Sequence, residues 1–171
     1  MPEFAIRPAR QQDAAAVRAL LSELACGQLL PGEPLSKRFW LTEDDVRRDM
    51  LGAICHCDLL WLGQDAVGVA VWFWTYKSFR AARGLFVEDL YVKPACRGRG
   101  LGKALLAHLA ARARAVQGFL EWQVLDRNTP AIAFYESLGA HRVPDWLNYR
   151  LEGEALLRLT SSVSDKERPA R

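Results

Sequence analysis

One short glycine-rich segment constrains this chain more than any other feature. Residues 97–103 read Arg-Gly-Arg-Gly-Leu-Gly-Lys. The run before them, Leu85–Val92, has the composition of a strand, and from Leu101 onward apolar residues recur at helical spacing. Glycines at such a junction let the backbone approach a ligand closely, and the free amides at a helix N-terminus attract phosphate. The segment therefore predicts a phosphate-binding loop, with an ordinary glycine-rich turn as the structural alternative.

Two other phosphate motifs fit this segment poorly. A P-loop requires Ser or Thr after its lysine, whereas Ala104 follows Lys103. A dinucleotide loop requires glycine at position 103, and its strand opens a parallel sheet instead of closing a meander.

The rest of the chain predicts alternating helices and strands. Apolar runs at Cys57–Leu62, Val67–Tyr76 and Leu85–Val92 predict an antiparallel meander. Further strands are expected at 4–7, 119–125 and 146–151. Two helices are expected to begin at caps: one runs from Asp13 to Gly27, and the other runs from the Thr42–Asp45 capping box to Met50. Two more helices are expected at 101–116 and 132–138.

The loop and its flanks resemble a known family. Arg-x-x-Gly-x-Gly between a strand and a helix is similar to the pyrophosphate loop of GNAT acetyltransferases. Segments 87–92, 124–128 and 133–140 resemble the spermidine/spermine and thialysine N-acetyltransferase branch, and His56-Cys57, 73–76, Trp146 and 153–156 extend the likeness.

This resemblance implies an α/β (α+β) fold of the GNAT type. It has a mixed central sheet with an antiparallel N-terminal meander, a splayed parallel strand pair and helices on both faces. We expect one domain over residues 1–159. Residues 160–171 carry almost no apolar side chain, so we expect a disordered tail there.

The resemblance also implies where acetyl-CoA binds. Backbone amides of Leu90, Tyr91 and Val92 would meet the acetyl carbonyl and the pantetheine. Asn128 matches a family residue near the pantetheine, although an asparagine before Thr129-Pro130 also suits a helix cap. The pyrophosphate would be held by Arg97, Gly98, Arg99, Gly100, Leu101, Gly102 and Lys103.

Two residues are the expected catalytic groups. Glu88 matches the family's acid beside the acetyl group, so it is the candidate base that takes the amine's proton through water. A structural or substrate-binding carboxylate is the alternative. Asp89 is expected on the opposite strand face, and with Glu88 and Trp146 it completes the expected substrate-binding set. Tyr135 matches the family's proton donor to the departing thiolate, and its alternative is a packing tyrosine.

The expected acceptor is the primary amine of a small molecule, attacked directly in a ternary complex. The polyamine enzymes of this branch carry acidic residues after the first helix, where this chain has Gly27-Gln28-Leu29-Leu30. Lys37 and Arg38 would repel a polyamine, so an amino-acid-like amine ranks above spermidine. The rivals are a peptide or protein N-acetyltransferase, a sugar-amine acetyltransferase and a non-catalytic CoA-binding protein.

Composition and charge favour the same reading. A net charge of +3 spread along 171 residues does not indicate nucleic-acid binding. No apolar run approaches the roughly 20 residues that cross a bilayer. The chain has four cysteines, expected as reduced thiols, and Cys55-His56-Cys57 lacks a second ligand pair for a metal. An acetyl-cysteine route through Cys96 ranks low because no histidine is close in sequence. We expect a cytoplasmic enzyme without metal or membrane, and the family implies a homodimer.

Overall fold

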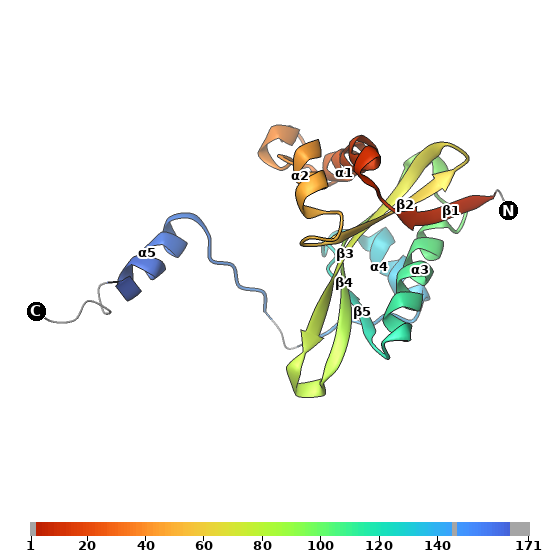
Figure 1. Ribbon diagram of the computed structural model, residues 1–171. Helices are drawn as coiled ribbons and strands as arrows, with labels where there is room; N and C mark the ends of the chain where they lie inside the picture. The colour runs from red at the N-terminus through yellow and green to blue at the C-terminus, as the bar shows by residue number, and fades with distance from the viewer. Residues whose placement is uncertain (1–2, 145–146, 165–171) are drawn as a thin grey trace, which may run out of the picture. The chain divides into compact units, whose positions relative to one another are not determined.

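The computed structural model describes residues 3–144 and 147–164, and its central element is one mixed sheet of five strands in the order β1-β2-β3-β4-β5 (Figure 1). The first four strands pair antiparallel and β5 pairs parallel to β4, as predicted. The strands are β1 Phe4–Pro8, β2 His56–Leu62, β3 Asp65–Lys77, β4 Ala82–Val92 and β5 Phe119–Trp122.

The parallel pair covers only the first half of β4. Residues Gly84–Val87 pair with Phe119–Trp122, and the pairing ends there. Beyond that point, Asp89–Val92 stay paired with β3 on one side, and on the other side Glu88–Val92 extend past β5. The expected splayed pair is therefore present, and it leaves the backbone edge of Glu88–Val92 unpaired by β5.

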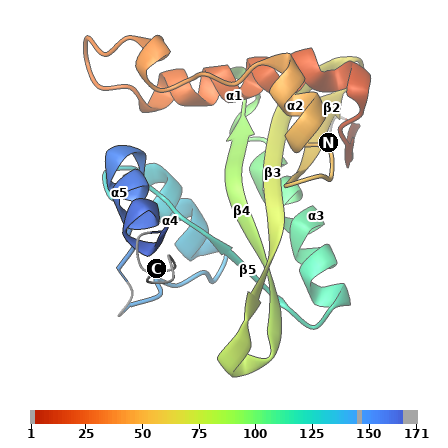
Figure 2. The ribbon, with the colours of Figure 1, turned by 60° about the vertical axis from the view of Figure 1, so that its left-hand side comes forward.

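Helices cover both faces of this sheet (Figure 2). On one face lie α1 (Ala14–Gln28) and α2 (Glu43–Asp49), and on the other lies α3 (Leu101–Ala115). Strand alternation sends side chains to opposite faces, so each face carries its own apolar core. The α1 side buries Val17, Leu20, Leu21, Val46, Leu59, Val69, Val71 and Tyr91, whereas the α3 side buries Leu60, Ala70, Trp72, Leu85, Val87, Leu101, Leu105 and Leu109.

Helix caps follow the sequence in one case and depart from it in another. Thr42 and Asp45 form the predicted capping box at the start of α2. Asp13 occupies the position before α1 but does not cap that helix. Its carboxylate instead accepts the guanidinium of Arg7 at 2.7 Å and the amide of Arg10 at 2.8 Å. The hydrogen bond from Arg7 lowers the pKa of Asp13.

The segment between α1 and α2 contains one short 3-10 turn, η2 (Leu35–Lys37). Of its large apolar side chains, Phe39 packs against the α1-side core. Trp40, by contrast, is 74% exposed.

The chain divides into two compact units, Met1–Gln123 and Val124–Arg171, and the second holds α4 (Thr129–Ser137) and α5 (Gly153–Ser164). The expectation of one domain over 1–159 stays a prediction. Residues 160–164, assigned to a tail from composition, belong to α5, and the rest of that tail lies outside the described residues.

The last predicted strand is wrong for residues 147–151, which adopt no regular structure. A strand exists only where a partner satisfies its backbone groups, and the described part of the second unit offers no other strand. Trp146 lies outside the described residues.

Candidate functional site

The glycine-rich loop joins β4 to α3 through a short 3-10 turn, η4 (Pro94–Cys96). Gly98 has φ 73° and Gly100 has φ 78°. Side chains other than glycine avoid this left-handed region. A Cβ at either position would meet nothing within 4 Å, so open space lies in front of the loop. The two glycines are therefore needed for backbone conformation, and they leave room for a ligand.

The start of α3 presents free backbone donors beside this space. Its first helical hydrogen bond runs from the amide of Ala104 to the carbonyl of Gly100 at 2.9 Å. The amides of Leu101, Gly102 and Lys103 thus precede the intrahelical pattern, and within the described chain no side chain caps the helix. These donors and the helix dipole suit an anion. The residues present fit a pyrophosphate, with the exposed Arg99 and Lys103 adding positive charge.

Arg97 has a structural function that the sequence did not reveal. Its Nε donates to the carbonyl oxygen of Val92 at 3.0 Å, and its guanidinium lies 5.7 Å from the ring centroid of Tyr91. The side chain therefore ties the loop to the end of β4. Its backbone amide donates to the carbonyl oxygen of Pro94 at 3.1 Å, so its predicted contact with the pyrophosphate stays a prediction.

Leu90, Tyr91 and Val92 lie on the part of β4 that extends past β5. Their backbone is bonded to β3 in register with Ala70, Val69 and Gly68. The opposite backbone edge of these three residues lies next to the loop and is not paired with β5. The structure thus places the predicted acyl-binding strand and the predicted phosphate loop side by side in the first unit.

A β-bulge brings Glu88 and Asp89 to the same face, which corrects the expectation that they point to opposite faces. Val87 pairs with Trp72 in the α3-side core, whereas Asp89 pairs with Val71 in the α1-side core. Glu88 is the extra residue between these pairs, and bulges interrupt the alternation of side chains in this way. Both carboxylates act on the thiol of Cys55, which packs against the α1-side core, so we place Glu88 and Asp89 together on that side.

The environment of the two carboxylates differs. Glu88 is exposed and Asp89 is half-buried. Burial, together with the smaller effect of the neighbouring charge of Glu88, raises the pKa of Asp89 to about 6. Perturbed carboxylates next to a ligand site are candidates for function.

Cysteine chemistry finds no support at this site. Burial, together with the carboxylates Asp49, Asp89 and Glu88, raises the pKa of the Cys55 thiol. Burial likewise raises the pKa of Cys57. A thiol that is held protonated is a poor nucleophile. In the part of the chain that the structure describes, no three or more His, Cys, Asp or Glu side chains are grouped so that they could hold a metal.

Sequence reasoning also missed a buried polar network on the α3 side of the sheet. Asp58 is 1% exposed. It accepts the indole of Trp72 at 2.7 Å and the guanidinium of Arg112 at 3.1 Å. Nε2 of His108 lies 3.7 Å from this carboxylate. The network joins β2, β3 and α3, the helix that begins at the loop.

The remaining predicted residues belong to the second unit. Asn128 caps α4, since its Oδ1 accepts the amide of Ala131 at 3.4 Å. Tyr135 lies on α4, half-buried, and burial raises the pKa of its phenol. Their predicted contacts with acetyl-CoA stay predictions.

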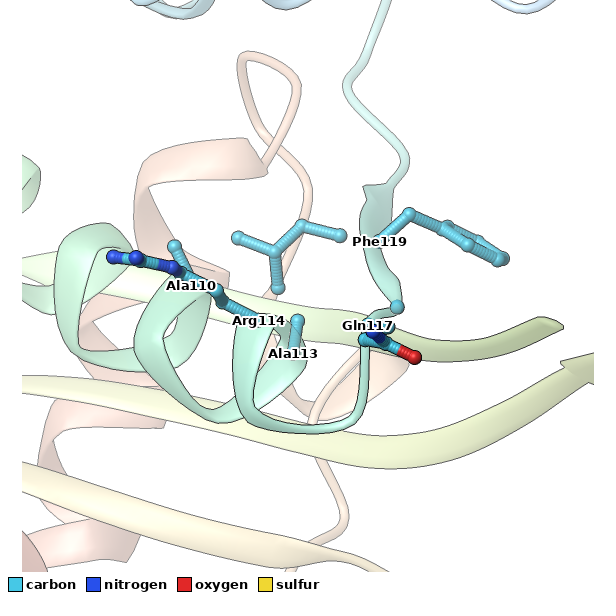
Figure 3. Close-up of a pocket in the computed structure, with 7 residues that line it drawn as sticks. Ala110, Ala113, Arg114, Gln117 and Phe119 are labelled. Carbon is cyan, nitrogen blue, oxygen red and sulfur yellow. The ribbon is translucent and has the colours of Figure 1, made fainter.

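An open hollow of about 670 Å³ lies at the other end of α3 (Figure 3). Its walls include Ala110, Arg114, Gln117 and Phe119. At a rise of ~1.5 Å per residue, it is roughly 20 Å from the loop, so it includes none of the predicted site.

No helix among the described residues is long and apolar enough to span a membrane.

Known proteins share the sequence and the fold. Residues 22–140 match the acetyltransferase (GNAT) family. A thialysine N-epsilon-acetyltransferase of Mus musculus is 30% identical, covering 93% of this chain and 98% of its own. An L-ornithine N5-acetyltransferase of Arabidopsis thaliana is 40% identical, but over only 52% of this chain and 40% of its own.

Solved structures agree on the fold. An integron cassette protein of V. cholerae superposes with a TM-score of 0.75 at 21% identity, covering 94% of this chain and 98% of its own. An aminoglycoside N-acetyltransferase in complex with CoA gives 0.67 at 20% identity, covering 86% and 94%. With the matched family region spanning most of the sheet, the loop and α4, the chain belongs to the GNAT acetyltransferase family and is an acetyl-CoA-dependent N-acetyltransferase.

Proposed function

We propose that this enzyme acetylates the primary amine of a small, amino-acid-like molecule or diamine. The observation that carries the proposal is the pair Glu88 and Asp89, brought to one face by the bulge in β4. Two carboxylates on one face attract an ammonium group. They lie on the same strand as the unpaired edge that leads to the phosphate loop.

Similarity to relatives supports an amino-acid side chain as the acceptor. The named substrates of two relatives, thialysine and ornithine, are amino acids with a side-chain amine. On the loop after α1, Arg38 is ion-paired with Glu33 at 2.7 Å. Lys37 is therefore the better candidate to meet an acceptor carboxylate.

The proposed reaction is a direct attack within a ternary complex. Acetyl-CoA supplies an activated thioester. The acceptor is an alkyl ammonium with a pKa near ~10.4, so it must lose a proton before it attacks. Glu88 takes this proton through water. The amine nitrogen then forms a bond to the acetyl carbon and loses its second proton to water, the carbon–sulfur bond breaks, and Tyr135 gives a proton to the thiolate and regains one from solvent. Amides of Leu90–Val92 stabilise the developing oxyanion.

The experiment is a measurement of free CoA thiol released from acetyl-CoA with a panel of amines. The panel holds thialysine, ornithine, lysine, spermidine, an aminosugar and a peptide N-terminus. We expect the amino-acid amines to give the highest kcat/KM, with Tyr135→Phe and Glu88→Gln both losing kcat.

Other outcomes would choose between the rivals. Preference for the peptide or the aminosugar would replace the proposed acceptor. Binding of acetyl-CoA with no thiol release for any amine would favour the non-catalytic CoA-binding protein.

A homodimer is also part of the proposal, on the strength of the resemblance to the thialysine branch. Sedimentation equilibrium tests it directly. A species of twice the chain mass of 19.2 kDa is expected, and a concentration-independent monomer would contradict it.

A further inference from the structure

A carboxylate on α1 reaches the far end of β4. The hydroxyl of Tyr91 donates to Oε2 of Glu23 at 2.9 Å, across 68 residues of sequence. Tyr91 is only 6% exposed. Nζ of Lys93 lies 3.7 Å from Oε1 of the same glutamate. Glu23 therefore contacts Tyr91 and Lys93, the two neighbours of Val92, where α1 crosses the end of β4 (Figure 2).

The ring of Tyr91 in turn supports Arg97. The guanidinium of Arg97 lies 5.7 Å from the ring centroid, within the range of a cation–π contact. Its Nε also donates to the carbonyl of Val92. A continuous set of contacts thus runs from Glu23 through Tyr91 to Arg97, the first residue of the loop.

This connection matters because the two glycines that follow Arg97 contribute no side chain to hold the loop. Gly98 and Gly100 have no side chains to pack, and open space lies in front of both. Glycines also leave the backbone unusually free. The side chain of Arg97 is the anchor that precedes them, and its orientation depends on the two contacts just described. A displaced anchor would move the loop amides relative to the end of β4.

We propose that Glu23 is a positioning residue for the phosphate-binding loop, acting through Tyr91 and Arg97 on the pyrophosphate of the acyl donor. The proposal rests on the proposed function for the identity of that ligand. Glu23 itself touches neither the donor nor the reacting atoms. Its removal should weaken only those interactions that the loop makes.

The test compares two donors that differ in the group the loop would hold. Acetyl-CoA carries the pyrophosphate, whereas S-acetylpantetheine carries the same thioester and lacks the pyrophosphate. For Glu23→Ala and Tyr91→Phe, we expect the KM for acetyl-CoA to rise roughly 5- to 10-fold, the value of one lost hydrogen bond. For Glu23→Ala, the KM for S-acetylpantetheine and the kcat should stay within error of the wild type.

Calorimetric titration with CoA gives a readout independent of turnover. The same variants should lose the same factor in Kd. Glu23→Gln should recover most of the affinity, because its amide oxygen can still accept the hydroxyl of Tyr91. Glu43→Ala is the matched control: this glutamate on α2 is partly exposed and ion-paired only locally with Arg47, so its replacement should leave all constants unchanged.

Several results would overturn the inference. An equal rise in KM for both donors, or unchanged CoA affinity in Tyr91→Phe, would show that Glu23 does not act on the loop. If Glu23→Ala does not fold, Tyr91→Phe and Glu23→Gln decide the question. Wild-type protein that binds no CoA would instead refute the proposed function, so the two failures are distinguishable.

Discussion

Replacing Asp89 by asparagine should stabilise the protein while impairing acceptor binding. Burial and the charge of Glu88 raise the pKa of this carboxyl from 3.8 to about 6. The folded protein must therefore hold a carboxylate that its surroundings disfavour. At ~1.36 kcal/mol per pKa unit the cost at neutral pH is at most about 3 kcal/mol, less whatever solvent screening returns to this partly exposed group.

The sign of the pH dependence follows from the raised pKa. Between pH 4 and 6 the folded state binds more protons at Asp89 than the unfolded chain does, so stability falls as pH rises through this window. Asparagine does not titrate, so in the variant this position adds no pH dependence to the stability. Urea denaturation of variant and wild type is compared at pH 4.5 and pH 7. At pH 4.5 their free energies of unfolding should differ only slightly. At pH 7 the variant should be more stable, by up to about 3 kcal/mol in the free energy of unfolding.

Glu88→Gln is the matched control because it removes the neighbouring charge and leaves Asp89 buried. Since burial is the larger cause of the raised pKa, this control should keep most of the pH dependence. Equal or lower stability of Asp89→Asn at pH 7, or the same difference at both pH values, would refute the reasoning.

Two further substitutions test the support of the loop. Asp58→Ala leaves the indole of Trp72 and the guanidinium of Arg112 without their shared acceptor, so unfolding in urea should show a loss of about 3–5 kcal/mol. A loss below ~1 kcal/mol would mean that the network does not hold α3 to the sheet. Gly100→Ala forces a side chain into the left-handed region at a cost of about 1–2 kcal/mol, and calorimetry should show weaker CoA binding. Gly63→Ala, with φ 60° and the same open surroundings, should cost similar stability without changing CoA affinity, and equal effects of both on CoA would contradict the loop's function.

The sequence predicted the features that depend on local patterns. Apolar spacing located the meander strands and α1 to α3, and the glycines at 98 and 100 marked the loop because only glycine adopts such φ angles freely. The Thr42–Asp45 capping box is likewise a contact between near neighbours.

Features that depend on pairing between distant segments were missed. The bulge at Glu88 exists only in the register between β3 and β4. Strand alternation alone therefore predicted that Asp89 and Glu88 lie on opposite faces. Residues 147–151 have a strand-like pattern but no described strand in their unit with which to pair. The contacts of Arg97 with Val92 and of Tyr91 with Glu23 likewise need the fold before they can be seen.

The most direct test of the account is the structure of the product formed from acetyl-CoA labelled with ¹³C in its acetyl group. After incubation with thialysine, NMR should show one labelled amide on the side-chain amine, with an equal amount of free CoA. Labelled acetyl-CoA that stays intact in the presence of bound enzyme and every small amine tested would contradict the central claim.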